Sequence, residues 1–267
     1  MLRRFHKMHG LGNDFVILDA RAEPLAIDAV RARAIADRHR GIGCDQVVVL
    51  EASDAADLKM RIWNADGGEV GACGNASRCV AVLTGARSIE TAGGTLSVSA
   101  ADGHPRIDMG MPRFEWDAIP LAYPADTAAL PVGWETLERP AALNVGNPHL
   151  VFFVDDCEGV DLARLGPLIE HDPLFPERVN VNVASVDGPN QIRLRVWERG
   201  AGLTRACGTG ACATAVAAIR RGLAAAPVTV RLPGGDLVIG WRPGEPIHMS
   251  GPATSVFAGE IDLEALA

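Results

Sequence analysis

Two Ala-Cys-Gly tripeptides, half a chain apart, are the residues of this sequence best suited to chemistry. Residues 61–74 (RIWNADGGEVGACG) and residues 195–208 (RVWERGAGLTRACG) align without a gap, and Arg, Trp, Gly, Ala, Cys and Gly recur in register. Cys73 and Cys207 are therefore 134 positions apart (207 minus 73) in a chain of 267 residues. Two thiols related by an approximate two-fold axis can face one carbon from opposite sides, where one removes a proton and the other returns it. The pattern predicts a two-base inversion of a carbon centre.

The repeat extends along most of the chain. At the same offset Gly12-Asn13 matches Gly146-Asn147, and QVVV at 46–49 matches NVNV at 180–183. After a small change in loop length, GGTL at 93–96 matches GGDL at 234–237, and IDMGMP at 107–112 matches IHMSGP at 247–252. A chance likeness between Ala- and Gly-rich helix starts would not give matched blocks in one order. A period of this size indicates two duplicated domains.

Composition and charge exclude several classes of protein. Hydrophobic residues make up 48% of the chain and charged residues 22%, which is ordinary for a globular protein. The net charge of −8 and the absence of a Lys/Arg run argue against nucleic acid or an anionic membrane as a partner. The N-terminal MLRRFHKMHG has no apolar stretch behind its basic residues, and no apolar run approaches the ~20 residues of a membrane span. We therefore expect no signal peptide, no membrane segment and a cytoplasmic location.

The cysteines do not suggest a structural disulfide framework or a metal site. There are six, at 44, 73, 79, 157, 207 and 212, and a reducing cytoplasm disfavours disulfides between them. None are spaced as C-x-x-C, and no histidine stands beside the 73/79 or 207/212 pairs, so no metal is expected. Cys44, Cys79, Cys157 and Cys212 are interpreted as small buried packing residues.

Apolar runs bounded by turn residues predict buried strands, and glycines close the predicted helices. In the first half the order is strand 15–18, helix 28–39, strands 47–50 and 59–64, helix 74–84 and a strand after Ser88. The second half repeats it with strand 150–154, helix 162–171, strands 179–186 and 192–198, helix 208–221 and a strand after Val228. Pro-rich residues 112–140 are expected to contain the domain connection. The predicted fold class is α+β, with two domains and a central helix in each.

Each Ala-Cys-Gly cysteine is predicted to stand directly before the first turn of a helix. The backbone N–H groups of that turn are unpaired, and the macrodipole places partial positive charge there. A thiol in this position is expected to have a pKa below its usual value of about 8.5. The same N–H groups can hold a carboxylate and stabilise a carbanion next to it. The residues that supply them are Gly74, Asn75, Gly208 and Thr209.

A covalent cofactor is disfavoured. Amino-acid inversion often uses a pyridoxal phosphate Schiff base on a lysine. The chain has only Lys7 and Lys59, and neither follows a phosphate-binding glycine loop. Gly208-Thr209-Gly210 matches only a fragment of a phosphate loop. We therefore expect chemistry without a cofactor.

Longer blocks carry a resemblance to a known family. They are HKMHGLGNDF, RGIGCDQ, RIWNADGGEVGACGN, VGNPHL, LFPERVNV and VWERGAGLTRACGTGACA, and they span nearly the whole chain. The chain resembles diaminopimelate epimerase, a cofactor-independent family that interconverts LL- and meso-diaminopimelate in lysine and peptidoglycan precursor synthesis. The resemblance implies that Cys73 and Cys207 are the acid and base pair, with Cys207 as proton acceptor in the LL-to-meso direction. It also implies that His149 and Glu198 set the pKa values of the thiols.

The same resemblance implies a fold, an assembly and a substrate site. The fold would be two pseudo-symmetric domains, residues 1–113 joined by 255–267 and residues 114–254, each a mixed, mostly antiparallel sheet wrapped around a central helix. The assembly would be a homodimer, and the partner a small molecule, diaminopimelate. Arg199 suits a bidentate grip on its distal carboxylate, and asparagine amides can donate or accept there. The implied substrate-binding set is Asn13, Gln46, Asn64, Gly74, Asn75, Asn147, Asn180, Glu198, Arg199, Gly208 and Thr209.

Two alternatives remain open. The nearer one is a proline or hydroxyproline type of racemase on the same duplicated scaffold. Arg199 and the asparagines argue against it, because a substrate with one carboxylate needs no distal clamp. The second is a thiol redox protein that cycles a Cys73–Cys207 disulfide, which would leave the polar residues unexplained.

Overall fold

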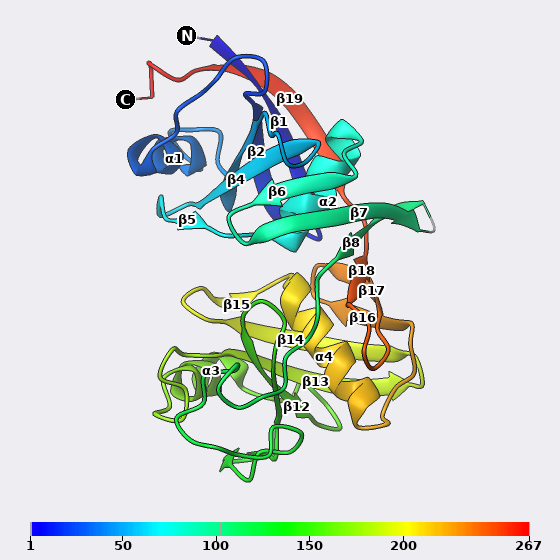
Figure 1. The fold of residues 1–267 in the computed structure, drawn as a ribbon. Coiled ribbons are helices and arrows are strands. Elements are labelled where there is room, and N and C mark those ends of the chain that lie inside the picture. Colours follow the sequence, from blue (N-terminus) through cyan, green and yellow to red (C-terminus); the bar gives the residue numbers. More distant parts are fainter. Residues whose placement is uncertain (1, 102, 267) are drawn as a thin grey trace. The chain divides into compact units, whose positions relative to one another are not determined.

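The computed structural model describes residues 2–101 and 103–266, and the chain forms two compact units. Unit 1 contains residues 1–107 and 251–267, and unit 2 contains residues 108–250 (Figure 1). The chain thus changes unit at Ile107 and Asp108, before the Pro-rich segment 112–140 that was expected to contain the connection. That segment belongs to unit 2 because its apolar residues are buried there. They are Ile119, Leu121, Leu130 and Leu137.

Unit 1 is a mixed sheet in which most neighbouring strands are antiparallel. Strands β19, β1 and β2 pair antiparallel, β2 and β3 pair parallel, and β3 and β4 pair antiparallel. Strand β4 then pairs parallel with β6, and β6, β7 and β8 continue antiparallel. The elements are β1 (Leu2–Gly10), β2 (Asn13–Asp19), α1 (Ala29–Ala36), β3 (Gln46–Glu51), β4 (Leu58–Asn64), β5 (Glu69–Val70), α2 (Gly74–Thr84), β6 (Ser88–Thr91), β7 (Gly94–Ala101), β8 (His104–Asp108) and β19 (Thr254–Asp262).

Unit 2 repeats the same order of strand pairings. Strands β11 and β12 pair antiparallel, β12 and β13 parallel, β13 and β14 antiparallel, β14 and β16 parallel, and β16, β17 and β18 antiparallel. The elements are β9 (Gly133–Trp134), β10 (Leu137–Glu138), β11 (Ala141–Asn144), β12 (Pro148–Phe153), α3 (Leu162–Glu170), β13 (Asn180–Gly188), β14 (Gln191–Glu198), β15 (Gly202–Thr204), α4 (Gly208–Arg220), β16 (Val228–Leu232), β17 (Gly235–Gly240) and β18 (His248–Ser250).

The register of the parallel strands confirms the duplication seen in the sequence. Phe15 on β2 stands opposite Gln46 on β3, and His149 on β12 stands opposite Asn180 on β13. Both pairs are related by the same offset of 134 positions (149 minus 15 and 180 minus 46).

Side chains alternate between the two faces of the parallel strands, and each face packs against a different helix. In unit 1, Val16 and Val47 pack with α1, whereas Phe15 and Val48 pack with α2. In unit 2, Leu150 and Val181 pack with α3. The residues that alternate with them, His149 and Asn182, therefore face α4.

The two long helices are the centres of their units. Helix α4 is buried over most of its length and contacts β11, β12, β13, β14, β16 and β17. Helix α2 is buried from Asn75 to Ala81 and contacts β1 and β2. The predicted α+β class, with a mixed and mostly antiparallel sheet around a central helix in each domain, is confirmed. In the part of the chain that the structure describes, no helix combines the length and the apolar character needed to cross a membrane.

Helix α1 ends earlier than the sequence predicted. Its N-cap is Asp28, whose carboxylate accepts from the backbone N–H of Arg31, as expected of a capping aspartate. The helix stops at Ala36 rather than His39, because Asp37 leaves the helical conformation with φ −60° and ψ 119°. The Asp37 carboxylate accepts from the N–H groups of His39 and Arg40 at 2.8 and 3.0 Å, and this local turn replaces the next helical turn.

Candidate active site

Both cysteines of the repeat stand at the position that the sequence predicted, directly before a helix. Cys73 is the N-cap of α2 and Cys207 is the N-cap of α4, and both have extended backbones. Their carbonyls accept the first helical hydrogen bonds, from Ser77 at 2.9 Å and from Ala211 at 3.0 Å. Because the two cysteines belong to different units, the surroundings of each are described separately.

In unit 1, the Cys73 thiol contacts an asparagine whose amide orientation is fixed. The Cys73 Sγ lies 3.9 Å from Asn13 Oδ1, which also accepts from Asn75 Nδ2 at 3.1 Å. The amino group of Asn13 donates to Asp45 Oδ2 at 3.1 Å. The Asn13 amide therefore presents its oxygen, not its nitrogen, to the half-buried thiol of Cys73.

An ion network holds Asp45 in place, and sequence reasoning missed it. Arg38 donates to Asp14 Oδ1 at 2.7 Å and to Asp45 Oδ1 at 2.8 Å, and Lys7 donates to Asp14 Oδ2 at 2.5 Å. Burial by itself would raise the pKa of Asp14, but hydrogen bonds from Arg38 and Lys7 outweigh it and hold that pKa well below the usual range. Asp14 therefore keeps its ion pairs with Lys7 and Arg38, and Arg38 also holds Asp45 beside Asn13. The block HKMHGLGNDF contains two residues of this network, Lys7 and Asp14, but no pattern in the sequence indicated that they form an ion pair.

Two further predicted residues of unit 1 face each other across the sheet. Gln46 on β3 stands opposite Asn64 on β4, and Gln46 Nε2 donates to Asn64 Oδ1 at 2.8 Å. Asn64 is therefore turned so that its amino group is left to donate. Asn75 is also held, because the fully buried guanidinium of Arg78 donates to Asn75 Oδ1 at 2.9 Å. Arg78 is a second residue whose role sequence reasoning missed.

In unit 2, Cys207 is surrounded more closely than Cys73. Its side chain is buried, its Sγ accepts from the N–H of Gly210 at 3.3 Å, and Thr209 Oγ1 lies 3.5 Å away. It is also hydrogen-bonded to Glu198, which accepts from Thr204 Oγ1 at 2.5 Å.

Burial reverses the predicted direction of the Cys207 pKa. The helix N-terminus was expected to lower it, and the bonds from Thr209 and Gly210 do favour the thiolate. Burial and the negative charge of Glu198 outweigh them and raise the pKa of Cys207 well above its ordinary value. Burial likewise raises the pKa of Glu198. Both shifts favour the protonated form of each group, and in the hydrogen bond between them the Cys207 thiol is the donor.

The segment that carries Glu198 and Arg199, at the end of β14, is held in place by hydrogen bonds to several neighbouring residues. Asn180 Oδ1 accepts from the backbone N–H of Arg199 at 3.0 Å, and Asn180 Nδ2 donates to the carbonyl of Pro148 at 2.8 Å. Buried Glu170 accepts from the N–H of Gly200 at 2.9 Å. The exposed guanidinium of Arg199 donates to the carbonyl of Glu177 at 2.7 Å. In this arrangement Asn180 positions the turn, and its direct contact with substrate stays a prediction.

His149 is wholly buried and has partners on both ring nitrogens. Nε2 lies 2.8 Å from Asn147 Oδ1, and Nδ1 lies 3.1 Å from Asn182 Nδ2. Burial lowers the pKa of His149 to about 3, so the imidazole is neutral at physiological pH. Sequence reasoning named Asn180 but missed Asn182, two residues further along the NVNV block. The predicted influence of His149 on the pKa of a catalytic thiol stays a prediction.

The sequence-predicted residues thus gather into one group in each unit. Unit 1 brings together Asn13, Cys73, Gly74 and Asn75 at the start of α2, with the Gln46–Asn64 pair on neighbouring strands. Unit 2 brings together Asn147 with His149, Asn180 with Arg199, and Glu198 with Cys207, Gly208 and Thr209 at the start of α4.

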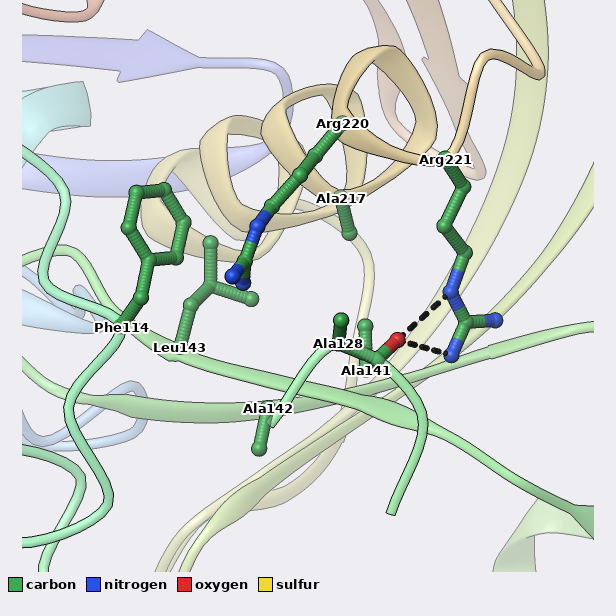
Figure 2. A pocket seen from close by; sticks show the side chains of 8 residues that line it. All are labelled: Phe114, Ala128, Ala141, Ala142, Leu143, Ala217, Arg220 and Arg221. Carbon is green, nitrogen blue, oxygen red and sulfur yellow. Dashed lines mark hydrogen bonds between the residues drawn. The ribbon is translucent and has the colours of Figure 1, made fainter. Parts of the chain in front are cut away.

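A small hollow in unit 2 lies apart from this group (Figure 2). Its lining residues are Phe114, Ala128, Ala141, Ala142, Leu143, Ala217, Arg220 and Arg221. Arg221 borders it and donates to the carbonyl of Ala128 at 2.9 and 2.6 Å. Two lining residues, Ala217 and Arg220, belong to the C-terminal end of α4, whereas Cys207 precedes its first residue, and a helix of 13 residues is about 20 Å long. None of the predicted site residues lines this hollow, so it is not part of the candidate site.

A family model and curated relatives identify one and the same family. Residues 5–115 and 141–256 match the family model described as diaminopimelate epimerase. The diaminopimelate epimerase of Sphingopyxis alaskensis is 66% identical over 263 residues, covering 98% of this chain and 98% of the relative. That of Rhizorhabdus wittichii is 64% identical over 264 residues, covering 98% of this chain and 96% of the relative.

A solved structure shares the fold at low sequence identity. It is a hydroxyproline epimerase from Agrobacterium vitis with bound trans-4-hydroxy-L-proline. The TM-score is 0.64 at 15% identity, with 97% of this chain and 92% of that chain covered. At this identity the likeness extends to the two-domain fold alone.

Proposed function

The chain belongs to the diaminopimelate epimerase family, and from that premise we propose that it interconverts LL- and meso-diaminopimelate by exchanging protons between Cys73 and Cys207, without a cofactor. It is an isomerase of the amino-acid epimerase class. Its reaction would serve lysine and peptidoglycan precursor synthesis.

One observation carries the proposal. Two duplicated units each present a cysteine at the N-cap of their central helix, at positions related by the repeat. A single such thiol could serve many purposes, but an equivalent pair suits removal of a proton from one face of a carbon and its return on the other.

The two thiols differ in ways that suit different roles. The Cys207 thiol donates a hydrogen bond to Glu198, so a thiolate can form at Cys207 when that proton moves to the carboxylate. Cys73 points its thiol at the carbonyl oxygen of Asn13, an arrangement that favours the protonated form. In the LL-to-meso direction Cys207 would therefore act as base and Cys73 as acid.

The step balances within these groups. The Cys207 thiolate takes the α-proton, so a C–H bond breaks and an S–H bond forms, and the electron pair stays on the α-carbon and its carboxylate. Cys73 then delivers its proton to the opposite face and becomes a thiolate. The N–H groups of Gly74, Asn75, Gly208 and Thr209, at the starts of α2 and α4, are suited to bind the carboxylate that carries the developing charge.

Substrate choice would depend on the polar residues away from the thiols. Diaminopimelate carries a second amino-carboxylate end, for which Arg199 offers a guanidinium and Asn64 an amino group. A proline type of substrate has no such end, and this distinguishes the proposal from its nearest rival.

The decisive experiment is incubation of the reduced protein with LL-diaminopimelate in heavy water. We expect deuterium at one α-carbon and appearance of the meso form, with no reaction of L-proline. Cys73→Ala and Cys207→Ala should each abolish turnover while diaminopimelate binding persists. Epimerisation by either variant would rule out the two-base mechanism, and activity on L-proline instead would favour the racemase alternative. A redox protein would leave LL-diaminopimelate unchanged under reducing conditions.

A further inference from the structure

Asn13 and Asn147, which occupy equivalent positions of the repeat, are held with their side-chain amides in opposite orientations. Both follow a loop glycine with positive φ, Gly12 at 87° and Gly146 at 106°. Asn13 gives its amino group to Asp45 and keeps its oxygen towards Asn75 and Cys73. Asn147 gives its oxygen to His149 Nε2 at 2.8 Å. Its amino group is therefore the end that remains available.

The orientation of Asn147 follows from a chain of hydrogen bonds that begins in the core of unit 2. Asn182 Nδ2 donates to the carbonyl of Leu150 at 2.9 Å, and a carbonyl can only accept. The amide nitrogen of Asn182 is thereby identified, and that nitrogen also lies 3.4 Å from the carbonyl of Asn180 and 3.1 Å from His149 Nδ1, to which it can only donate. Nδ1 must therefore accept, and the single proton of the neutral imidazole is on Nε2. Nε2–H in turn donates to the oxygen of Asn147.

We propose that Asn182 is a positioning residue which fixes the tautomer of His149 and, through it, turns the Asn147 amide so that its amino group meets a carboxylate of the substrate. The proposal rests on the proposed function for the identity of that substrate. The hydrogen-bond chain itself does not depend on it.

The surroundings of Asn182 oppose the reverse orientation of its amide. Asn182 is fully buried, and its oxygen has no hydrogen-bond partner among the described residues. That oxygen faces the first turn of α4, because a Cβ built on Gly210 would lie 2.7 Å from it. The first turn of a helix carries partial positive charge, which suits an amide oxygen and repels an amino group. A flipped amide would also lose the bond to Leu150.

The repeat shows that this hydrogen-bond chain is not needed to build the fold. At the equivalent positions of unit 1 stand Phe15 in place of His149 and Val48 in place of Asn182, and both are buried in the α2 face of the sheet. Two apolar residues therefore satisfy the same backbone geometry. The polar pair in unit 2 costs desolvation that unit 1 avoids, and a role in orienting Asn147 accounts for it.

The tautomer can be measured directly from the ring-nitrogen chemical shifts of His149 in ¹⁵N-labelled protein, with the signal assigned by comparison with His149→Gln. We expect a protonated Nε2 and an unprotonated Nδ1 from pH 8 to pH 5. Asn182→Leu removes the donor to Nδ1 and should populate the other tautomer. A proton on Nδ1 in the unaltered protein would overturn the proposal.

Kinetics provide the second measurement. In Asn182→Leu the Asn147 amide is no longer held, and loss of one hydrogen bond to a charged group should raise KM for LL-diaminopimelate roughly 10- to 100-fold with little change in kcat. Thr214→Val is the control, because the buried Thr214 hydroxyl has no partner among the described residues and its loss should leave KM unaltered. If Asn182 only supported the fold, kcat would fall with the fraction of folded protein and KM would not change.

A double variant guards against misfolding of the single one. His149→Phe with Asn182→Val copies the pair that unit 1 already accommodates, so a folded core is expected. Its KM should rise at least as far as that of Asn182→Leu, and a KM within twofold of the unaltered protein would refute the positioning role. If the unaltered protein shows the expected tautomer but does not epimerise diaminopimelate, the proposed function fails while the hydrogen-bond chain stands.

Discussion

Gly210→Ala tests the packing around Cys207 with a single added carbon. Gly210 is in the first turn of α4, and its N–H is the donor to Cys207 Sγ. A Cβ at this position would lie 2.7 Å from Asn182 Oδ1, 3.2 Å from Cys207 Sγ and 3.2 Å from Val196 Cγ2. Ordinary contacts of a Cβ lie between 3.4 and 4 Å, so each of these three atoms must move.

Two opposing effects set the size of the loss in stability. An alanine within a helix is favoured over glycine by about 1 kcal/mol. Overpacking of a filled core costs about 1–3 kcal/mol, and Asn182 cannot yield easily because its amide is held by Leu150 and His149. The free energy of unfolding should therefore fall by roughly 0–2 kcal/mol, and the protein should remain folded at 25 °C.

The effect on catalysis should be larger than the effect on stability. Displacement of Cys207 Sγ by a fraction of an ångström would move the proposed base away from the α-proton, and misplacement on the order of 1 Å costs about 100-fold in rate. We expect kcat/KM to fall about 30- to 100-fold, mostly in kcat.

Gly188→Ala is the matched control, because Gly188 belongs to the same unit and a Cβ there meets no atom within 4 Å. The measurements are urea unfolding followed by circular dichroism and steady-state epimerisation of LL-diaminopimelate. Gly188→Ala should change stability by no more than about 0.5 kcal/mol and leave kcat/KM unaltered. If Gly210→Ala keeps kcat/KM within twofold, or loses activity only in proportion to unfolded protein, the contact reasoning is wrong.

Three further outcomes follow from the protonation and exposure of the site. Glu198→Gln should lower kcat about 10²- to 10⁴-fold with KM nearly constant. The control, Glu245→Gln on an exposed loop, should leave both kcat and KM unaltered. Steady-state kinetics measure both constants, and a fully active Glu198→Gln variant would exclude the carboxylate as proton acceptor. His149 has a folded pKa of about 3 against an ordinary 6.5, so the unfolded chain binds its proton first as pH falls and stability is lost below pH 6.5. Between pH 7.5 and pH 5 the unaltered protein should lose about 2 kcal/mol more than His149→Phe in urea unfolding, and parallel losses would contradict the buried neutral imidazole. Brief treatment with iodoacetamide should modify half-buried Cys73 before buried Cys207, as peptide mass spectrometry can show, and the reverse order would contradict the raised pKa of Cys207.

Local patterns in the sequence predicted most of the elements. Helix α2 begins at Gly74 and ends at Thr84 as predicted, because Gly85 stops it in a left-handed conformation with φ 73°. The prediction for α1 was too long, because the capping capacity of Asp37 competes with the helix and a pattern of apolar spacing does not register it. The segments that form β1 and β19 were not predicted, and β19 in particular is largely exposed and lacks the apolar alternation of a half-buried strand.

The candidate site shows a similar division. Residue types and the internal repeat were enough to place Cys73 and Cys207 at the N-caps of equivalent helices, because capping geometry is local. The ion network of Lys7, Asp14 and Arg38 was not predicted, because its members come from different strands and a loop and meet only after the sheet has formed.

The amino-acid sequence by itself determined the duplication, the α+β class, the family and the placement of Cys73 and Cys207 at equivalent helix starts, since each depends on residue type and spacing along the chain. Only the tertiary structure decided the direction in which the pKa of Cys207 is shifted and the orientation of the neighbouring side chains. Burial reversed the expected direction of the Cys207 pKa, because desolvation in the core outweighs the partial charge of a helix end. The orientation of the Asn147 amide likewise depends on Asn182, a side chain on a neighbouring strand that the sequence places 35 positions away (182 minus 147).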